Sequence, residues 1–169
     1  MLRLGGAEVQ IAYLELVDNH IGALGGFALG KALSRGNNLS LLTLQLNFNT
    51  SLGDEGVINL CQGLRTNGTL KQLHLEFCSI TAEGAPAIAE VLANCYSSLE
   101  VLDGFHTLIS LLHLDSNCCV MKVLRLNGNC LRGEGLLALS KGLLHNCRLQ
   151  RLSLADNKIE YVRHLFISA

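Results

Sequence analysis

The sequence has few charged residues. They make up 16% of its 169 residues, whereas about 25% is typical of soluble proteins. The formal net charge is −1, so the overall charge gives no reason to expect nucleic acid as a partner. Hydrophobic residues amount to 49%, and the mean hydropathy is +0.34. We therefore expect much of the surface to be packed inside the fold or covered by another protein.

Targeting and membrane-spanning segments are also lacking. Residues 1–6 do not contain the apolar core of a signal peptide. The longest apolar stretch, 99–126, is interrupted too often for a membrane span, by Asp103, His106, His113 and Asp115. The seven cysteines are odd in number and form no CxxC pair, which favours reduced thiols. These features predict a cytoplasmic protein that is not inserted in a membrane.

A leucine pattern repeats along the chain. The template L-x-x-L-x-L-x-x-N/C-x-L occurs five times, starting at Ile11, Leu41, Leu70, Met121 and Leu149. Its ninth position holds Asn19, Asn49, Cys78, Asn129 and Asn157. A sixth, incomplete copy starts at Leu99, with Gly104 in place of the third leucine and no asparagine after it. We expect the ninth side chain to bond backbone groups in the tight turn that leaves each strand.

A helix is predicted after each of the first four complete templates. A glycine is followed four and eight positions later by apolar residues on one helix face, namely Leu29 and Leu33, Leu60 and Leu64, Ile88 and Leu92, and Leu139 and Leu143. Asp54 and Thr81 are plausible N-caps. Repeated strand–helix units stack their strands in parallel through right-handed crossovers. The sequence therefore predicts one α/β domain over 1–169 with about six units, including an irregular unit at 99–120 and an incomplete last unit at 149–169.

The repeats resemble those of the ribonuclease-inhibitor-like leucine-rich-repeat family. The spacing of 28 to 30 residues, the full helix in each unit and an x-E-G motif at the helix starts carry the resemblance, at 54–56, 82–84 and 133–135. It implies a short horseshoe-shaped solenoid with its sheet on the concave face and its helices on the convex face. Such relatives bind proteins and include ribonuclease inhibitor, NOD-like receptor sensing domains, the Ran GTPase-activating protein, tropomodulins and ciliary axoneme proteins.

The resemblance leads to a functional hypothesis. We expect a non-enzymatic protein-interaction module or scaffold within a multi-protein assembly, with a ciliary or cytoskeletal setting as the first choice. The alternatives are a regulator of a cytosolic enzyme or GTPase and an actin-capping, tropomodulin-like domain. No catalytic residues, cofactor, metal or small-molecule substrate are expected.

Two surfaces are candidates for binding a partner. Side chains alternate along a strand, so every second residue faces away from the leucine core. The candidates on this concave face are Tyr13, Glu15, Gln45, Phe48, His74, Phe77, Asp103, Arg125 and Arg151. The second candidate surface is the C-terminal edge, formed by Val162, Leu165, Phe166 and Ile167. There a partner, or the tail itself, would cover the last strand.

Two other patterns have structural explanations. Residues 25–31 match the phosphate-binding pattern G-x-x-x-x-G-K, but Ala32 stands where Ser or Thr should bind magnesium. Leu29 and Leu33 also place this segment in a repeat helix. The clusters of His113 with Cys118–Cys119 and of His145 with Cys147 could suggest a metal site. Reduced cysteines packed within the repeats are the preferred explanation.

Overall fold

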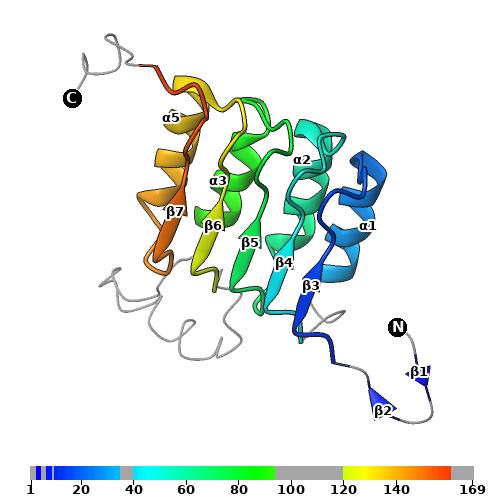
Figure 1. Ribbon diagram of the computed structural model, residues 1–169. Coiled ribbons are helices and arrows are strands. Elements are labelled where there is room, and N and C mark those ends of the chain that lie inside the picture. Colours follow the sequence, from blue (N-terminus) through cyan, green and yellow to red (C-terminus); the bar gives the residue numbers. More distant parts are fainter. Residues whose placement is uncertain (1–2, 5–6, 9, 35–39, 94–119, 161–169) are drawn as a thin grey trace, which may run out of the picture.

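The computed structural model describes residues 3–4, 7–8, 10–34, 40–93 and 120–160. Five strands form one parallel sheet in chain order, β3 (Tyr13–Glu15), β4 (Thr43–Gln45), β5 (Gln72–His74), β6 (Val123–Arg125) and β7 (Arg151–Ser153). Within these residues, four helices cover one face of this sheet (Figure 1), namely α1 (Ala23–Leu33), α2 (Gly53–Leu64), α3 (Ala85–Ala93) and α5 (Arg132–Leu143). A short antiparallel pair, β1 (Arg3–Leu4) and β2 (Ala7–Glu8), lies outside the sheet. The α/β solenoid expected from the sequence is confirmed.

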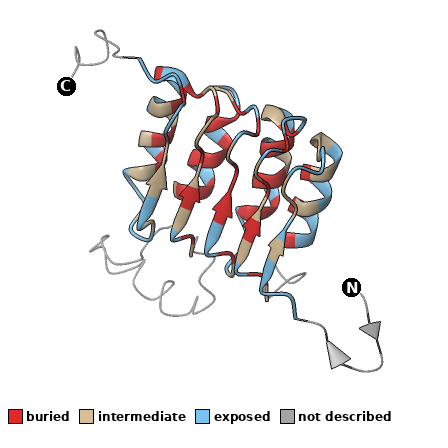
Figure 2. Cartoon of the chain, in the orientation of Figure 1, coloured by how far each residue is buried: buried red, intermediate tan, exposed pale blue. Residues whose placement is uncertain are grey.

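The core is built from leucines that line up between units. The central residues of the five strands are paired in register, and all of them are leucine, at 14, 44, 73, 124 and 152. Leu44, Leu73 and Leu124 are at most 2% exposed, whereas those of β3 and β7 are only half-buried. Figure 2 shows the same gradient, with buried residues concentrated in the middle of the stack. Each unit thus depends on its neighbours to bury its leucines.

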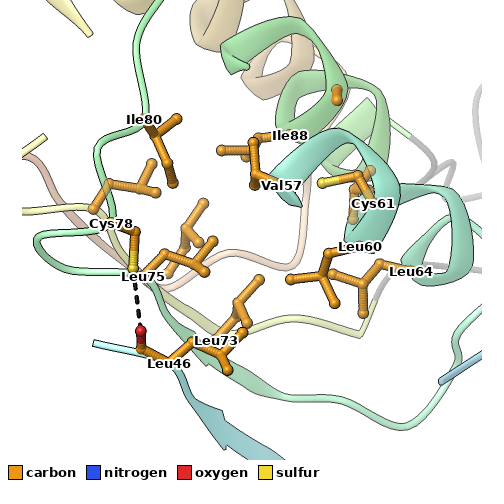
Figure 3. Close-up of a cluster of buried hydrophobic side chains, with 14 of the residues drawn as sticks. Leu46, Val57, Leu60, Cys61, Leu64, Leu73, Leu75, Cys78, Ile80 and Ile88 are labelled. Carbon is orange, nitrogen blue, oxygen red and sulfur yellow. Dashed lines mark hydrogen bonds between the residues drawn. The ribbon is translucent and has the colours of Figure 1, made fainter. Parts of the chain in front are cut away.

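The apolar face that the sequence predicts for each helix, called its stripe here, packs onto these leucines. Figure 3 shows Leu73 of β5 and Leu75, just after this strand, on the side of the sheet that faces Leu60 and Leu64 of α2. The stripe residues of α3 are also buried, and those of α1 and α5 are buried or partly buried against the same core. The predicted helix faces are therefore confirmed in all four units.

The number of stacked strands differs from the prediction. β5 pairs directly with β6, with His74 opposite Arg125, so no strand from the Leu99 copy lies between them. The expectation of six strands is wrong on this point, and the described sheet has five. The irregular unit 99–120 itself falls almost entirely outside the described residues.

Two kinds of turn alternate along the stack. We number the units 1 to 5 in the order of β3 to β7. The eighth template residue has a positive φ in every unit. Odd units have a second positive φ two residues later, at His20, Ser79 and Lys158, whereas in even units it comes four or five residues later, at Gly53 and Arg132. The alternation continues from unit 3 to unit 4, which agrees with the direct pairing of β5 and β6.

The ninth template residue ties neighbouring units together. The Asn49 side chain donates to the carbonyls of Leu16 and Leu46 and accepts from the amides of Asn19 and Ile21. Its Oδ1 distances to those two amides are 3.0 and 2.9 Å. The expected role in the turn is therefore confirmed, and it extends to the preceding unit.

Odd units need less from this position. Cys78 Sγ donates to the carbonyl oxygen of Leu46 at 3.1 Å, whereas Asn157 donates through Nδ2 while its Oδ1 is buried without a partner. Because the even-unit turn does not present the same pair of amides to the next unit, the acceptor role of this position is smaller in an odd unit, and the donor role is the one that Cys78 and Asn157 share. A thiol fills that donor role, which explains how cysteine replaces asparagine in unit 3.

The thiols of Cys61 and Cys78 are expected to resist alkylation in the native protein. Burial raises the pKa of both thiols to about 12, and the thiolate is the reactive form. Treatment with iodoacetamide near pH 8, followed by peptide mapping by mass spectrometry, should leave both unmodified until guanidinium is added. Modification at the same rate in native and denatured protein would contradict this account of the core.

Small residues bring the helices into backbone contact in pairs. A Cβ added to Gly63 of α2 would overlap the backbone of Gly30 in α1, and one added to Gly142 of α5 would overlap that of Ala89 in α3. Gly26 and Gly30 of α1 press in the same way on α2. Both glycines of the phosphate-binding pattern, Gly25 and Gly30, therefore lie within α1, and Gly30 packs against the backbone of α2, as the repeat interpretation predicts.

One predicted N-cap has a different role. Asp54 lies inside α2, whose N-cap is Leu52 without a side-chain hydrogen bond. Its carboxylate instead accepts from the amides of Thr81 and Gly84 and from the Thr81 hydroxyl, at 2.8 to 2.9 Å. Asp54 therefore holds the turn before α3, in the next unit, and the prediction that it caps its own helix is wrong.

Candidate protein-binding face

The open sheet face is the side of β3–β7 opposite the helices (Figure 1). Predicted residues lie on every strand of it, with Tyr13 and Glu15 on β3, Gln45 on β4, His74 on β5, Arg125 on β6 and Arg151 on β7. Phe48 and Phe77 occupy the turns after β4 and β5. Asp103 and the four residues of the C-terminal edge, Val162, Leu165, Phe166 and Ile167, lie outside the described residues. The structure thus brings eight of the nine concave-face candidates onto one surface.

Phe48 and Phe77 form a stacked pair. Their ring centroids are 4.9 Å apart and the rings are nearly parallel, at 4°. The side chains are 49% and 40% exposed. Both residues have a positive φ, which is unfavourable for a bulky side chain. Backbone preference therefore does not explain phenylalanine at these two positions.

The stack ends at a glycine. Gly128 occupies the same template position in unit 4, and a Cβ there would overlap the ring of Phe77. The glycine lets this edge of the Phe77 ring lie directly against the backbone of the next unit. The result is a flat apolar platform at the carboxyl ends of β4 and β5.

Polar residues on β3 and β4 are bonded to one another. The Tyr13 hydroxyl donates to Glu15 Oε2 at 3.1 Å, and Gln45 Nε2 donates to the Tyr13 hydroxyl oxygen at 2.7 Å. These three side chains are linked by two hydrogen bonds at one end of the face. Fewer of their polar groups are left for a partner.

A second polar row was missed by the sequence analysis. Asn47 Nδ2 donates to Glu76 Oε2, and Asn127 Nδ2 donates to Glu76 Oε1. Ser153 Oγ continues the row by donating to Asn127 Oδ1 at 2.8 Å. These residues lie in the strands or in the turns after them. The available signal was template position seven, which holds Asn, Glu and Asn in units 2, 3 and 4.

His74 and Arg125 lie at the centre of the face. They are opposite one another on β5 and β6, and His74 is 8% exposed. His74 Nε2 and Arg125 Nε are both buried without a hydrogen-bond partner. Burial, followed by the nearby Arg125 charge, lowers the pKa of His74 below its usual value. The imidazole is therefore neutral at pH 7, and Arg125 carries the positive charge of the pair.

The described part of the chain offers neither a cluster of metal ligands nor a membrane-spanning helix. No group of three or more His, Cys, Asp or Glu side chains there could hold a metal ion. The proposed cluster of His113 with Cys118–Cys119 lies outside that part. None of the described helices is long and apolar enough to cross a membrane.

Comparison with known proteins agrees with this architecture. The model of the leucine-rich-repeat family matches residues 12–30, 37–61, 66–89 and 117–140. The chain belongs to the leucine-rich-repeat family. Its repeats are of the ribonuclease-inhibitor-like kind, because ribonuclease inhibitor of Mus musculus is 38% identical over 120 residues, covering 69% of this chain. The alignment spans only 21% of that protein's length.

Two further matches are a second protein relative and a solved structure of similar fold. NACHT, LRR and PYD domains-containing protein 9C of Mus musculus is 30% identical over 178 residues, covering 83% of this leucine-rich-repeat chain and 17% of its own length. Among solved structures, actin-binding site 2 of leiomodin-1 superposes with a TM-score of 0.62 at 18% identity, covering 85% of this chain and 69% of that one. At that identity the likeness shows the fold alone.

Proposed function

We propose that this leucine-rich-repeat chain is a non-enzymatic protein-interaction module that binds its partner on the open sheet face. The stacked Phe48–Phe77 platform is the observation that carries the proposal. Two large apolar rings are held half-exposed by an unfavourable backbone conformation, and exposed aromatic groups are frequent anchors of protein interfaces. A cytoplasmic assembly suits the family, and its ciliary or cytoskeletal form is part of the proposal.

Removing both rings should weaken binding without unfolding the protein. The Phe48→Ala/Phe77→Ala double variant is expected to lose more than about 1 kcal/mol of binding free energy, or at least about five-fold in affinity. Partners would first be captured by affinity purification with the full chain and identified by mass spectrometry. Affinities of the purified partners would then be measured by calorimetry.

A matched control removes apolar area from the helical side. Phe27 on α1 and Leu137 on α5 are also exposed, at 51% and 38%, so Phe27→Ala/Leu137→Ala should leave affinity unchanged. Unchanged affinity in the Phe48/Phe77 variant, with loss in the control, would place the site on the helices.

The relatives suggest two more specific roles. Ribonuclease inhibitor is named for an enzyme that it inhibits, and leiomodin-1 is described by its actin-binding site. A regulator of a cytosolic enzyme and an actin-binding domain are therefore the alternative proposals for this chain. Inhibition of a pancreatic-type ribonuclease and co-sedimentation with actin filaments test them directly.

The C-terminal edge is a separate proposal. β7 pairs with β6 on one side, and the described residues provide no strand on its other side. We propose that a partner covers this edge together with Val162, Leu165, Phe166 and Ile167. Sedimentation of the isolated chain tests the idea, because an uncovered edge should cause self-association that co-expression with the partner removes.

A further inference from the structure

The two ends of the open sheet face differ in how their polar groups are paired. On β3 and β4, the polar side chains bond to one another, as described above. On β5–β7 and at the residues directly before β5 and β6, none of the cationic side chains forms an ion pair or a side-chain hydrogen bond within the described part of the chain. We call these four residues the basic half-face, namely Lys71, Lys122, Arg125 and Arg151.

The four cations come from adjacent segments. Lys71 and Lys122 precede β5 and β6, and the Lys122 amide donates to the Lys71 carbonyl at 2.7 Å. The Lys122 carbonyl accepts in turn from the amide of Arg151 at 3.0 Å. Since neighbouring strands are about 4.8 Å apart, the group spans about 10 Å across the sheet. That is close to the screening length at physiological salt, so the four charges act together on a bound ion or side chain.

Negative charge on this part of the face is already engaged or lies at its margin. Both carboxylate oxygens of Glu76 accept from the amides of Asn47 and Asn127. Asp156 lies in the turn beyond β7. Neither carboxylate forms an ion pair with the basic half-face among the described residues. Among the described residues the local charge is therefore positive, although the chain as a whole has a net charge of −1.

The centre of the half-face also lacks hydrogen-bond acceptors. His74 is 92% buried, being 8% exposed, and its Nε2 has no partner. Arg125 Nε beside it is likewise unpaired. Buried polar groups in native proteins are usually bonded. The Arg125 side chain is partly exposed, so a carboxylate docked on its guanidinium would compensate the charge.

We propose that the basic half-face binds an acidic segment of a partner protein. The proposal rests on the proposed function, because it specifies what the open sheet face recognises. The carboxylates of the segment lie over the four cations, and an apolar side chain of the same segment rests on Phe48 and Phe77. Lys71 and Phe77 are six residues apart along one unit, so at about 3.3 Å per residue the extended segment covers about 20 Å.

A nucleic acid fits this surface less well. Glu76 and Asp156 lie at the same end of the strands as the phenylalanine platform. A phosphate backbone following the aromatic rings would pass these carboxylates, and like charges repel it. An acidic peptide can place neutral residues there.

The test uses the full chain and three defined probes. The first is a fluorescein-labelled peptide of about twelve residues with alternating Glu and Ser and a terminal Phe. The second has Gln in place of every Glu, and the third is a single-stranded RNA of similar length. We expect the Glu peptide to bind at least about ten-fold more tightly than the Gln peptide at about 50 mM salt, with the difference largely lost at about 500 mM.

Charge reversal identifies the surface. Lys71 and Lys122 are exposed, so Lys71→Glu/Lys122→Glu should keep its circular dichroism spectrum while losing at least about ten-fold in affinity for the Glu peptide. Arg151→Glu should add to the loss. The charge-matched control Lys141→Glu/Arg148→Glu alters exposed cations on α5 and after it, and should change affinity less than about two-fold.

The outcomes separate this inference from the proposed function. Equal binding of the Glu and Gln peptides, equal losses in the test and control variants, or tighter binding of RNA would each overturn the acidic-segment proposal. A captured partner that is lost from the Phe48/Phe77 variant but binds the charge-reversed variant normally would retain the open face and reject its acidic selectivity. Normal binding to both variants would reject the proposed function itself.

Discussion

The Asn129→Ala variant is expected to lose about 3–9 kcal/mol of unfolding free energy, because three buried backbone groups lose their partner while the Leu126 carbonyl keeps its bond from Asn157. The side-chain oxygen Oδ1 of Asn129 accepts from the backbone N–H groups of Cys78 and Ile80 at 3.1 and 3.0 Å. Nδ2 of Asn129 donates to the carbonyls of Leu75 and Leu126, both at 2.8 Å. Each buried backbone group that loses its partner costs about 1–3 kcal/mol. A domain of this size has a net stability of about 5–15 kcal/mol, so the variant should be close to unfolding.

Asn157 provides the matched control. Its Nδ2 donates to the carbonyls of Leu126 and Leu154, but its Oδ1 has no partner. In Asn157→Ala the Leu126 carbonyl keeps its bond from Asn129, so we expect less than half the loss. Urea denaturation followed by circular dichroism measures both variants. Equal losses would mean that the acceptor bonds to unit 3 contribute little.

The Gly63→Ala variant is expected to be destabilised by about 1–3 kcal/mol. Helix propensity alone would predict a gain of about 1 kcal/mol from replacing glycine with alanine. The new Cβ, however, would overlap the backbone of Gly30 in α1. Backbone atoms cannot rotate away as a side chain can, so α1 and α2 would have to separate.

Gln62→Ala is the control for this substitution. Gln62 is the preceding residue of α2 and is exposed, so its replacement should change stability by less than about 0.5 kcal/mol. Thermal and urea unfolding would compare the two variants. A Gly63→Ala protein as stable as the original would show that the two helices are free to adjust their spacing.

The sequence was sufficient for the architecture because leucine periodicity reports burial directly. The strand and helix of each unit, and the register of the leucine at the centre of every strand, follow from the template. The sixth strand was wrongly expected because the incomplete template at Leu99 was counted as a full unit. Without a ninth-position Asn or Cys, its turn would have left buried backbone groups unpaired.

The candidate site was predictable only in part. Alternation along the strands placed Tyr13 to Arg151 on one face, but no local pattern indicated that Phe48 would stack on Phe77. Positive φ values at phenylalanine are not favoured by the residue itself. The role of Asp54 was equally hidden from the sequence, because its hydrogen-bond partners lie in the next unit. Such contacts depend on how neighbouring units meet, which a single repeat does not encode.

The alternating turns define what can be inserted into or removed from this solenoid. An odd unit fits only against an even one, because the hydrogen-bond partners of each turn lie in the other kind. Lengthening the stack by one unit would set two turns of the same kind side by side. The natural building block for engineering is thus a tandem pair, such as 11–69, and shortening or extension should proceed by two units at a time. The direct pairing of β5 with β6 preserves this parity, since units 3 and 4 meet as odd and even.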